Sequence, residues 1–286
     1  MTTAFVLSGG ASLGAVQVGM LQGLAERGVR PDLVFGSSAG AINAAWVAGD
    51  PQLARLDDLA TIWTGLRSRE IFPVRPLIGL LGFLGQRDSL VPPTGLRRLL
   101  ERHVSFTRLE DAPIPIAVIA TEVTTGREVV LDRGDTVDAV LASAAIPAVF
   151  PPVTIDGRVL MDGGVVNNTP ISNAVDAGAT RIYVLPTGYA CALSRAPRSA
   201  LGMTLQAISL LIEQQLIRDV EELQDRVDLR VIPPLCPQPV LPADFSHAGE
   251  LIARAKASAL EWLERFDREG VPPDEEVNLT FHNHHG

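Results

Sequence analysis

The feature that most constrains the fold of this chain is a repeated order of strand, tight turn and helix within the first fifty residues. Residues 4–7 are apolar and lead into Ser8-Gly9-Gly10, and residues 14–27 then carry apolar side chains at helical spacing. Asp32–Phe35 predicts a second strand, and a Gly-Ser corner leads into the alanine-rich helical stretch 39–48. Such βαβ alternation predicts an α/β fold, with a mostly parallel central sheet and helices on both faces.

The alternation continues along the chain, and no linker divides it. Residues 114–121 are the most strand-like run, and 127–131 follow a Thr-Thr-Gly turn, which predicts a β-hairpin. We therefore expect a single domain over residues 1–268 and a flexible tail over 269–286. Further strands are expected at 158–161, 181–185 and 229–232, and helices near 52–65, 94–103, 136–144, 170–177, 199–225 and 247–267.

Composition limits the partners that this chain can have. It has 286 residues, of which 47% are hydrophobic, so disorder is excluded for most of its length. The net charge is −9 and no cluster of Lys and Arg is visible, which excludes a nucleic-acid-binding protein. The same charge disfavours electrostatic docking onto anionic lipid but leaves apolar insertion open.

The expected location is the cytoplasm. The first residues, MTTAFVLSGGASLG, lack the basic region and long apolar core of a signal peptide, and no run of about 18 apolar residues is present. The apolar loop 76–85 is a candidate for peripheral contact with a membrane. Cys191 and Cys236 show no metal or redox spacing and are expected to be buried free thiols.

Gly36-Ser37-Ser38-Ala39-Gly40 has the pattern G-x-S-x-G between a predicted strand and a predicted helix. A nucleophilic serine needs a sharp turn of this kind, because its hydroxyl must project from the backbone and small neighbours let strand and helix approach closely. The alternative is that one of the two serines merely caps the helix.

A glycine-rich loop, Gly9–Gly14, follows the first strand and opens the first helix. Converging backbone N–H groups in such a loop can bind an anion. A dinucleotide fingerprint would require an acid at the end of the second strand, where Phe35-Gly36-Ser37 stands instead. An oxyanion hole beside Ser38 is the better interpretation.

Two residues are candidates for the base that would activate Ser38. Asp162 ends the predicted strand 158–161 and is followed by Gly163-Gly164, at a position where α/β sheets build their sites. Desolvation there would make its carboxylate more basic, although a plain Asp-Gly turn is the alternative. His247 fits the chain order of an α/β-hydrolase, but it follows a proline-rich loop, where capping a helix is the expected role.

Apolar segments elsewhere could bind an acyl chain. The proline-stiffened block 142–153, the loop 76–85 and the apolar positions of helix 201–217 could line a pocket or contact lipid, but helical spacing of this kind more often reflects core packing. The terminal His282, His284 and His285 are interpreted as part of the tail rather than as a metal site.

These motifs occur in an order that resembles the patatin-like phospholipase family of bacterial acyl hydrolases. The order is an early glycine-rich loop, G-x-S-x-G near Ser38, an A-S-x-A-x-P-x-x-F-P-P block and a D-G-G-x-x-N-N-x-P block, and the match covers about residues 4–190. The resemblance implies a three-layer α/β/α fold, and residues beyond about 190 match nothing recognisable.

The resemblance also implies a serine hydrolase that cleaves fatty-acyl esters of lipids without a metal or cofactor. Ser38 would be the nucleophile and Asp162 the general base, with an acyl-enzyme intermediate. The elbow would comprise Gly36, Ser37, Ala39 and Gly40; the aspartate motif Gly163 and Gly164; and the oxyanion hole Gly9, Gly10, Ala11, Ser12, Leu13 and Gly14.

Two positions depart from related patterns. Leu13 stands where the family usually has Arg or Lys, which favours a neutral ester or thioester over a phospholipid as substrate and also allows a catalytically weak lipid-binding member. Ser37 stands where related acyltransferases usually have His, so transfer to an acceptor other than water ranks as the second hypothesis.

Overall fold

The computed structural model describes residues 1–71, 89, 91–188, 200–235 and 244–269. In this part of the chain the strands form one sheet in the order β5-β6-β3-β2-β1-β7-β8, with β4 also paired to β3. The strands are β1 (Thr3–Leu7), β2 (Leu33–Ser37), β3 (Ile116–Glu122), β4 (Glu128–Leu131), β5 (Val153–Ile155), β6 (Arg158–Asp162), β7 (Arg181–Leu185) and β8 (Asp228–Val231).

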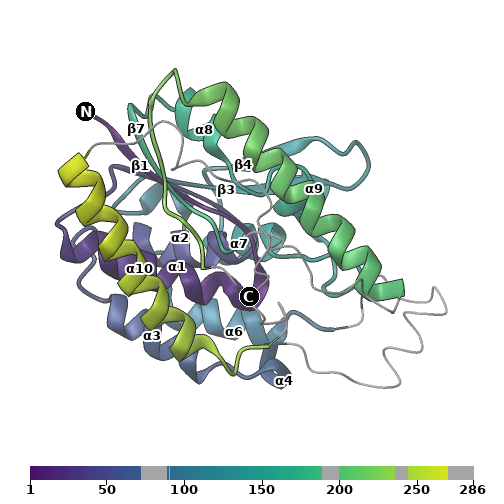
Figure 1. Cartoon of the computed structure of the whole chain (residues 1–286). Helices are drawn as coiled ribbons and strands as arrows, with labels where there is room; N and C mark the ends of the chain where they lie inside the picture. The colour runs from purple at the N-terminus through teal and green to yellow at the C-terminus, as the bar shows by residue number, and fades with distance from the viewer. Residues whose placement is uncertain (72–88, 90, 189–199, 236–243, 270–286) are drawn as a thin grey trace.

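Helices cover both faces of this sheet (Figure 1). One face carries α8 (Ile171–Asp176) and α9 (Ala200–Leu223). The other carries α1 (Gly14–Glu26), α2 (Ala39–Ala48), α3 (Leu56–Gly65), α4 (Ser68–Ile71), α6 (Thr94–His103), α7 (Thr136–Ser143) and α10 (Ala248–Glu269). The three-layer α/β/α fold expected from the sequence is therefore confirmed.

Alternation along each strand divides the core between the two layers. Phe5 and Leu7 of β1 pack with α1, α2 and α10, whereas Ala4 and Val6 of the same strand pack with α8 and α9. Successive strand side chains point to opposite faces, so a strand covered on both sides must be apolar throughout. This explains why the run AFVL is continuous rather than alternating.

The expected elements are present within a few residues of their predicted bounds, including the hairpin between β3 and β4. Strand β5 was not expected; it begins at the last residue of the block 142–153, which was interpreted as a rigid connection, and it pairs antiparallel with β6. The loop 76–85, both cysteines and residues 270–286 lie outside the described residues. No helix among the described residues is long and apolar enough to cross a membrane.

The sheet is mixed at β3. Strands β1, β2, β3, β7 and β8 are parallel, but β4 and β6 both run antiparallel to β3. Val118 and Ile119 pair with β2 on one edge and with β4 on the other. Ala120 and Thr121 pair with β4 on one edge and with β6 on the other. Strand β6 therefore continues along the same edge of β3 from the point where its pairing with β2 ends.

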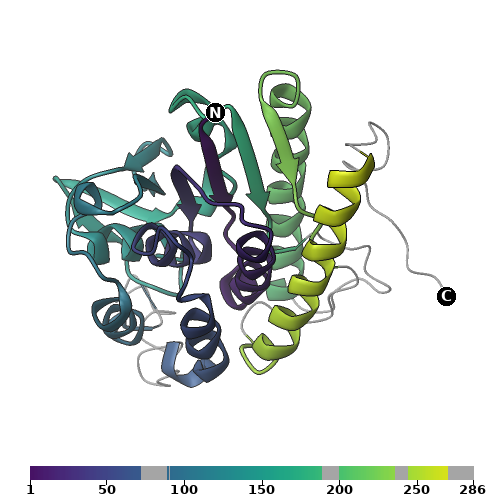
Figure 2. The ribbon, with the colours of Figure 1, turned by 90° about the vertical axis from the view of Figure 1, so that its left-hand side faces the viewer.

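The last described helix, α10, is part of the same core. It lies beside α1 on the sheet (Figure 2). A Cβ on Gly19 of α1 would collide with the Ile252 carbonyl of α10, and one on Gly23 would approach the Ala259 Cβ to 3.1 Å. Glycine at these positions lets the two helix backbones approach closely.

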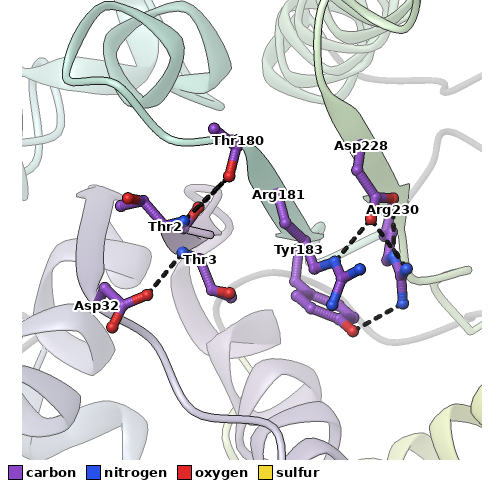
Figure 3. Close-up of polar contacts among 8 residues, drawn as sticks. All are labelled: Thr2, Thr3, Asp32, Thr180, Arg181, Tyr183, Asp228 and Arg230. Carbon is purple, nitrogen blue, oxygen red and sulfur yellow. Dashed lines mark hydrogen bonds and ion pairs between the residues drawn. The ribbon is translucent and has the colours of Figure 1, made fainter.

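Charged and polar contacts gather where the parallel strands begin (Figure 3). Asp228 of β8 accepts hydrogen bonds from Arg181 at 2.6 Å and from Arg230 at 2.8 Å. Arg230 also donates to the Tyr183 hydroxyl at 2.9 Å and lies 4.2 Å from the ring centroid of Phe266, which ties β7, β8 and α10 together.

Candidate active site

Ser38 sits on a sharp turn between β2 and α2. Its φ of +53° and ψ of −121° lie outside the regions that ordinary L-residues favour. A Cβ on Gly40 would collide with the Leu7 carbonyl, and one on Gly36 would approach the Gly40 carbonyl oxygen to 2.5 Å. Glycine is thus required on both sides of Ser38, as the elbow interpretation predicts.

The backbone of Ser38 is held by a residue that the sequence did not assign to the site. The Ser38 N–H donates to the Ser143 hydroxyl oxygen at 3.0 Å, and Ser143, the last residue of α7, is fully buried. Ser143 belongs to the A-S-x-A-x-P block, so its motif was visible but its role was not. It secures the strained turn from the neighbouring helix.

Asp162 meets Ser38 because of strand register. Ser37, the last residue of β2, pairs with Ile119, whereas Asp162, the last residue of β6, pairs with the next β3 residue, Ala120. The carboxyl ends of β2 and β6 therefore meet head-on along one edge of β3. Asp162 was expected at the end of a strand of a mostly parallel sheet, but its own strand is antiparallel to β3.

The two side chains form a buried hydrogen bond. The Ser38 hydroxyl donates to Asp162 Oδ2 at 2.7 Å, and Asp162 Oδ1 accepts from the Gly164 N–H at 2.8 Å. Burial raises the pKa of Asp162 to about 6, although these two hydrogen bonds act in the opposite direction. Its carboxylate is therefore more basic than an exposed aspartate.

The glycine-rich loop lies against Ser38, and two of its N–H groups have no hydrogen-bond acceptor among the described residues. A Cβ on Gly9 would sit 3.0 Å from the Ser38 Cβ. The N–H groups of Gly9, Leu13 and Gly14 donate to backbone carbonyls, whereas those of Gly10 and Ala11 make no hydrogen bond to any described residue. Ala11 adopts a positive φ of 51°, which sets the direction of these peptides.

Three residues outside the expected site, Thr187, Ser8 and Asn168, anchor this loop. Thr187, just beyond β7, donates its hydroxyl to the Gly9 carbonyl at 2.6 Å, and its own N–H donates to the Ser8 hydroxyl oxygen at 3.0 Å. The Gly9 N–H donates to the backbone carbonyl of Asn168 at 3.1 Å. The loop is thereby fixed to the segment that follows Asp162.

A buried amide network braces the start of α1. Gln17 donates to the carbonyls of Ser8 and Leu185 at 2.8 and 2.9 Å, and Asn43 donates to the Gln17 side-chain oxygen at 2.9 Å. Trp63 in turn donates to the Asn43 side-chain oxygen at 2.9 Å. Buried polar networks that are satisfied in this way rigidify their surroundings.

An apolar pocket opens beside Ser38. Its lining includes Ile42 of α2, Trp63 of α3 and Leu100 of α6, together with Ile146 and Phe150 from the proline-stiffened block. Apart from Ser38 and His103, the described side chains that line it are aliphatic or aromatic. The interpretation of block 142–153 as a pocket wall therefore agrees with the structure, and no described side chain of α9 is part of this lining.

The remaining residues that the sequence singled out contact neither Ser38 nor Asp162 through a hydrogen bond of the described residues. His247 precedes α10, lies near Asp244 and Glu250, and is not part of the pocket lining. Among the described residues, no histidine is hydrogen-bonded to Ser38 or Asp162. Ser12 is buried, and Leu13 packs, partly buried, against the main core. No group of three potential metal ligands occurs in the described part of the chain.

Comparison with known protein families gives this geometry its context. The family model described as patatin-like phospholipase matches residues 5–175, which include Ser38, Asp162 and the glycine-rich loop. The chain belongs to the patatin-like phospholipase family. Membership supports lipid hydrolase activity in general.

Relatives of this family member include larger proteins. An uncharacterised NTE family protein of Mycobacterium tuberculosis is 34% identical over 170 residues, covering 59% of this chain and 44% of its own length. Human patatin-like phospholipase domain-containing protein 6 is 30% identical over 189 residues, covering 65% of this chain and 13% of its own length. The chain thus matches less than half of either relative.

Two solved structures that this chain resembles have lower sequence identity to it than these relatives do. VipD from Legionella pneumophila is 15% identical, with a TM-score of 0.45 over 91% of this chain and 67% of its own. ExoU of Pseudomonas aeruginosa, in its complex with SpcU, is 18% identical, with a TM-score of 0.46 over 93% of this chain and 52% of its own.

Proposed function

We propose that this patatin-like protein is a serine acyl hydrolase that cleaves fatty-acyl esters of lipids through a Ser38–Asp162 dyad. The observation that carries the proposal is the 2.7 Å hydrogen bond from Ser38 Oγ, which lines an apolar pocket, to a buried carboxylate. A nucleophile bonded to its base beside an apolar acyl site is the arrangement that ester cleavage needs.

Acylation begins with a proton transfer within this hydrogen bond. Asp162 Oδ2 accepts the Ser38 hydroxyl proton while Oγ attacks the ester carbonyl carbon, whose oxygen becomes negatively charged. The unused N–H groups of Gly10 and Ala11 stabilise that oxygen, and each such donor contributes roughly 3 kcal/mol. The carbonyl–alkoxy bond then breaks, and the leaving alcohol takes the proton from Asp162.

Deacylation repeats these steps with water. Asp162 accepts a proton from a water molecule whose oxygen attacks the acyl carbon, and Ser38 Oγ leaves and recovers the proton. The fatty acid is released and the free dyad is restored. A carboxyl group with a pKa near 6 suits both directions of transfer near neutral pH.

The test combines active-site labelling with ester hydrolysis. We expect a fluorophosphonate probe to label the wild-type protein, and p-nitrophenyl acyl esters to be cleaved. Ser38→Ala should abolish both, and Asp162→Asn should lower turnover at least about 1,000-fold. Thr136→Val is the control, because this buried hydroxyl at the start of α7 has no hydrogen-bond partner among the described residues and lies outside the proposed site, so the variant should retain activity.

The dyad assignment is wrong if Asp162→Asn turns over esters like the wild type. Failure of the probe to label folded wild-type protein would instead favour a lipid-binding protein that has lost catalysis. Product analysis with an added alcohol acceptor then separates hydrolysis, which yields free fatty acid, from acyl transfer, which yields a new ester.

A further inference from the structure

One helix face outside the pocket is both apolar and exposed. Met203 and Leu211 of α9 are 53% and 69% exposed, and Ala207 between them is exposed as well. Residues four apart lie on one face of a helix, so these three form a continuous stripe. We call it the α9 apolar face (Met203, Ala207 and Leu211). The sequence favoured core packing for Leu211, which the structure does not support.

The same side of α9 changes character halfway along the helix. Beyond Leu211 the exposed positions on this side are Gln214, Arg218 and Glu222, which are polar or charged. Residues 200–212 carry no charged side chain, whereas residues 213–223 carry five, namely Glu213, Arg218, Asp219, Glu221 and Glu222. The second half is an ordinary amphipathic helix whose Leu216, Val220 and Leu223 are buried. Apolar exposure is therefore confined to one half of the helix.

That half lies at the end of the molecule that holds the dyad. Because α9 connects the parallel strands β7 and β8, it begins on the side of the carboxyl end of β7 (Figure 1). Strands β7, β1 and β2 are parallel, so this is also the end of the sheet where β2 leads into Ser38. Gln215 donates to the Val166 carbonyl at 3.0 Å, one helical turn beyond Leu211. The neighbouring Val165 is 54% exposed and ends the short turn that follows Asp162.

We infer that the α9 apolar face and Val165 dock onto an uncharged lipid surface and bring the dyad to ester bonds held there. This inference rests on the proposed function. The occupant is a zwitterionic or neutral lipid layer rather than an anionic one, because the face carries no cation and the chain has a net charge of −9. The exposed side chains are apolar up to Leu211 and polar from Gln214 onward, as expected for a helix whose first half lies in lipid and whose second half lies in water.

A matched pair of variants tests the docking surface. Leu211→Glu and Gln214→Glu each add one negative charge to the same exposed helix side, three residues apart. In a Ser38→Ala background, we expect Leu211→Glu to weaken flotation with phosphatidylcholine vesicles at least about tenfold, because insertion would bury leucine but not a charge. Gln214→Glu should float like the parent, and Ala207→Trp should float more strongly.

Catalysis provides the second readout in proteins that keep Ser38. The ratio of ester hydrolysis in phosphatidylcholine vesicles to hydrolysis of soluble p-nitrophenyl butyrate should fall at least about tenfold in Leu211→Glu and stay constant in Gln214→Glu. The inference is overturned if Leu211→Glu floats like its parent, or if both variants lose binding equally. It is also overturned if light scattering shows that Leu211→Glu splits a dimer, which would assign the face to a second copy.

The two proposals fail separately. If the wild-type protein cleaves neither ester, the proposed function is wrong, yet flotation of the Ser38→Ala protein still decides whether the α9 apolar face binds lipid. If esters are cleaved but Leu211→Glu floats with vesicles as strongly as its parent, the proposed function stands and the proposed docking surface is wrong.

Discussion

Ser38 combines a strained backbone with a fully hydrogen-bonded environment. Its φ of +53° is held by glycines that allow close approach and by the bond from its N–H to Ser143. Strained residues persist only where the surroundings over-determine them. The sequence could predict the strain, because G-x-S-x-G implies it, but could not identify Ser143 as the residue that opposes it, since that depends on how α7 packs.

Removal of the Ser143 hydroxyl should lower kcat while leaving KM nearly unchanged. In Ser143→Ala the Ser38 N–H loses its buried acceptor, which costs about 1–3 kcal/mol, and the nucleophile is no longer held in place. We expect kcat for p-nitrophenyl butyrate to fall about 10- to 100-fold, and Ser143→Thr to recover part of it.

Thr136→Val is the matched control for this experiment. Thr136 begins the same helix, is fully buried, and its hydroxyl has no hydrogen-bond partner among the described residues. If Thr136→Val lowers kcat as much as Ser143→Ala does, general disturbance of α7 explains the loss and the positioning role of Ser143 is refuted.

Asp162 should make both activity and stability depend on pH. Its pKa is raised from 3.8 to about 6 by burial, so kcat/KM should fall about tenfold per pH unit below 6 as the base becomes protonated. Stability has the opposite trend: the contribution of Asp162 is complete below pH 3.8 and is lost as the pH rises through about 6.

Asp162→Asn should therefore stabilise the protein at neutral pH. At pH 8 we expect its free energy of unfolding to exceed the wild-type value by up to about 3 kcal/mol, because a buried charge is absent. Urea unfolding should show this difference shrinking toward pH 4. A difference that stays constant over this range would mean that ionisation of Asp162 is not its cause.

At the scale of elements, close packing of α1 and α10 ties the two ends of the described chain together. The periodicity of both helices was readable from the sequence, and their bounds agree with it. The contact between the two helices could not be predicted from the sequence. Gly19 and Gly23 are poor helix formers by propensity, and only the position of α10 against them explains why glycine is present there.

Gly19→Ala should destabilise the whole protein. The added methyl would collide with the Ile252 carbonyl, and overpacking of this kind costs about 1–3 kcal/mol. Gly65→Ala is the control, because a Cβ at the end of α3 meets nothing within 4 Å. Thermal unfolding should show a lower Tm for Gly19→Ala alone; equal Tm values would mean that the helices separate without cost.

At the scale of the whole molecule, the two ends of the sheet differ in the side chains they carry. Ion pairs around Asp228 and Arg230 stabilise the end where the parallel strands begin. The proposed Ser38–Asp162 dyad, the glycine-rich loop and the α9 apolar face lie at the other end. The three layers were predictable, and Ser38 and Asp162 could be picked out as candidates, because each leaves a local pattern, whereas Ser143 and Thr187 could not. The antiparallel direction of β6 was not, since its short run carries no signal of its partner.

The head-on meeting of β2 and β6 has a consequence for how the protein folds. Ser38 and Asp162 are 124 residues apart and come together only when both strands are registered on one edge of β3. Long-range pairings of this kind close late, after the loop entropy between them has been overcome. The proposed ester hydrolysis is therefore expected to return only with the final cooperative phase of refolding, after the native secondary structure has already formed.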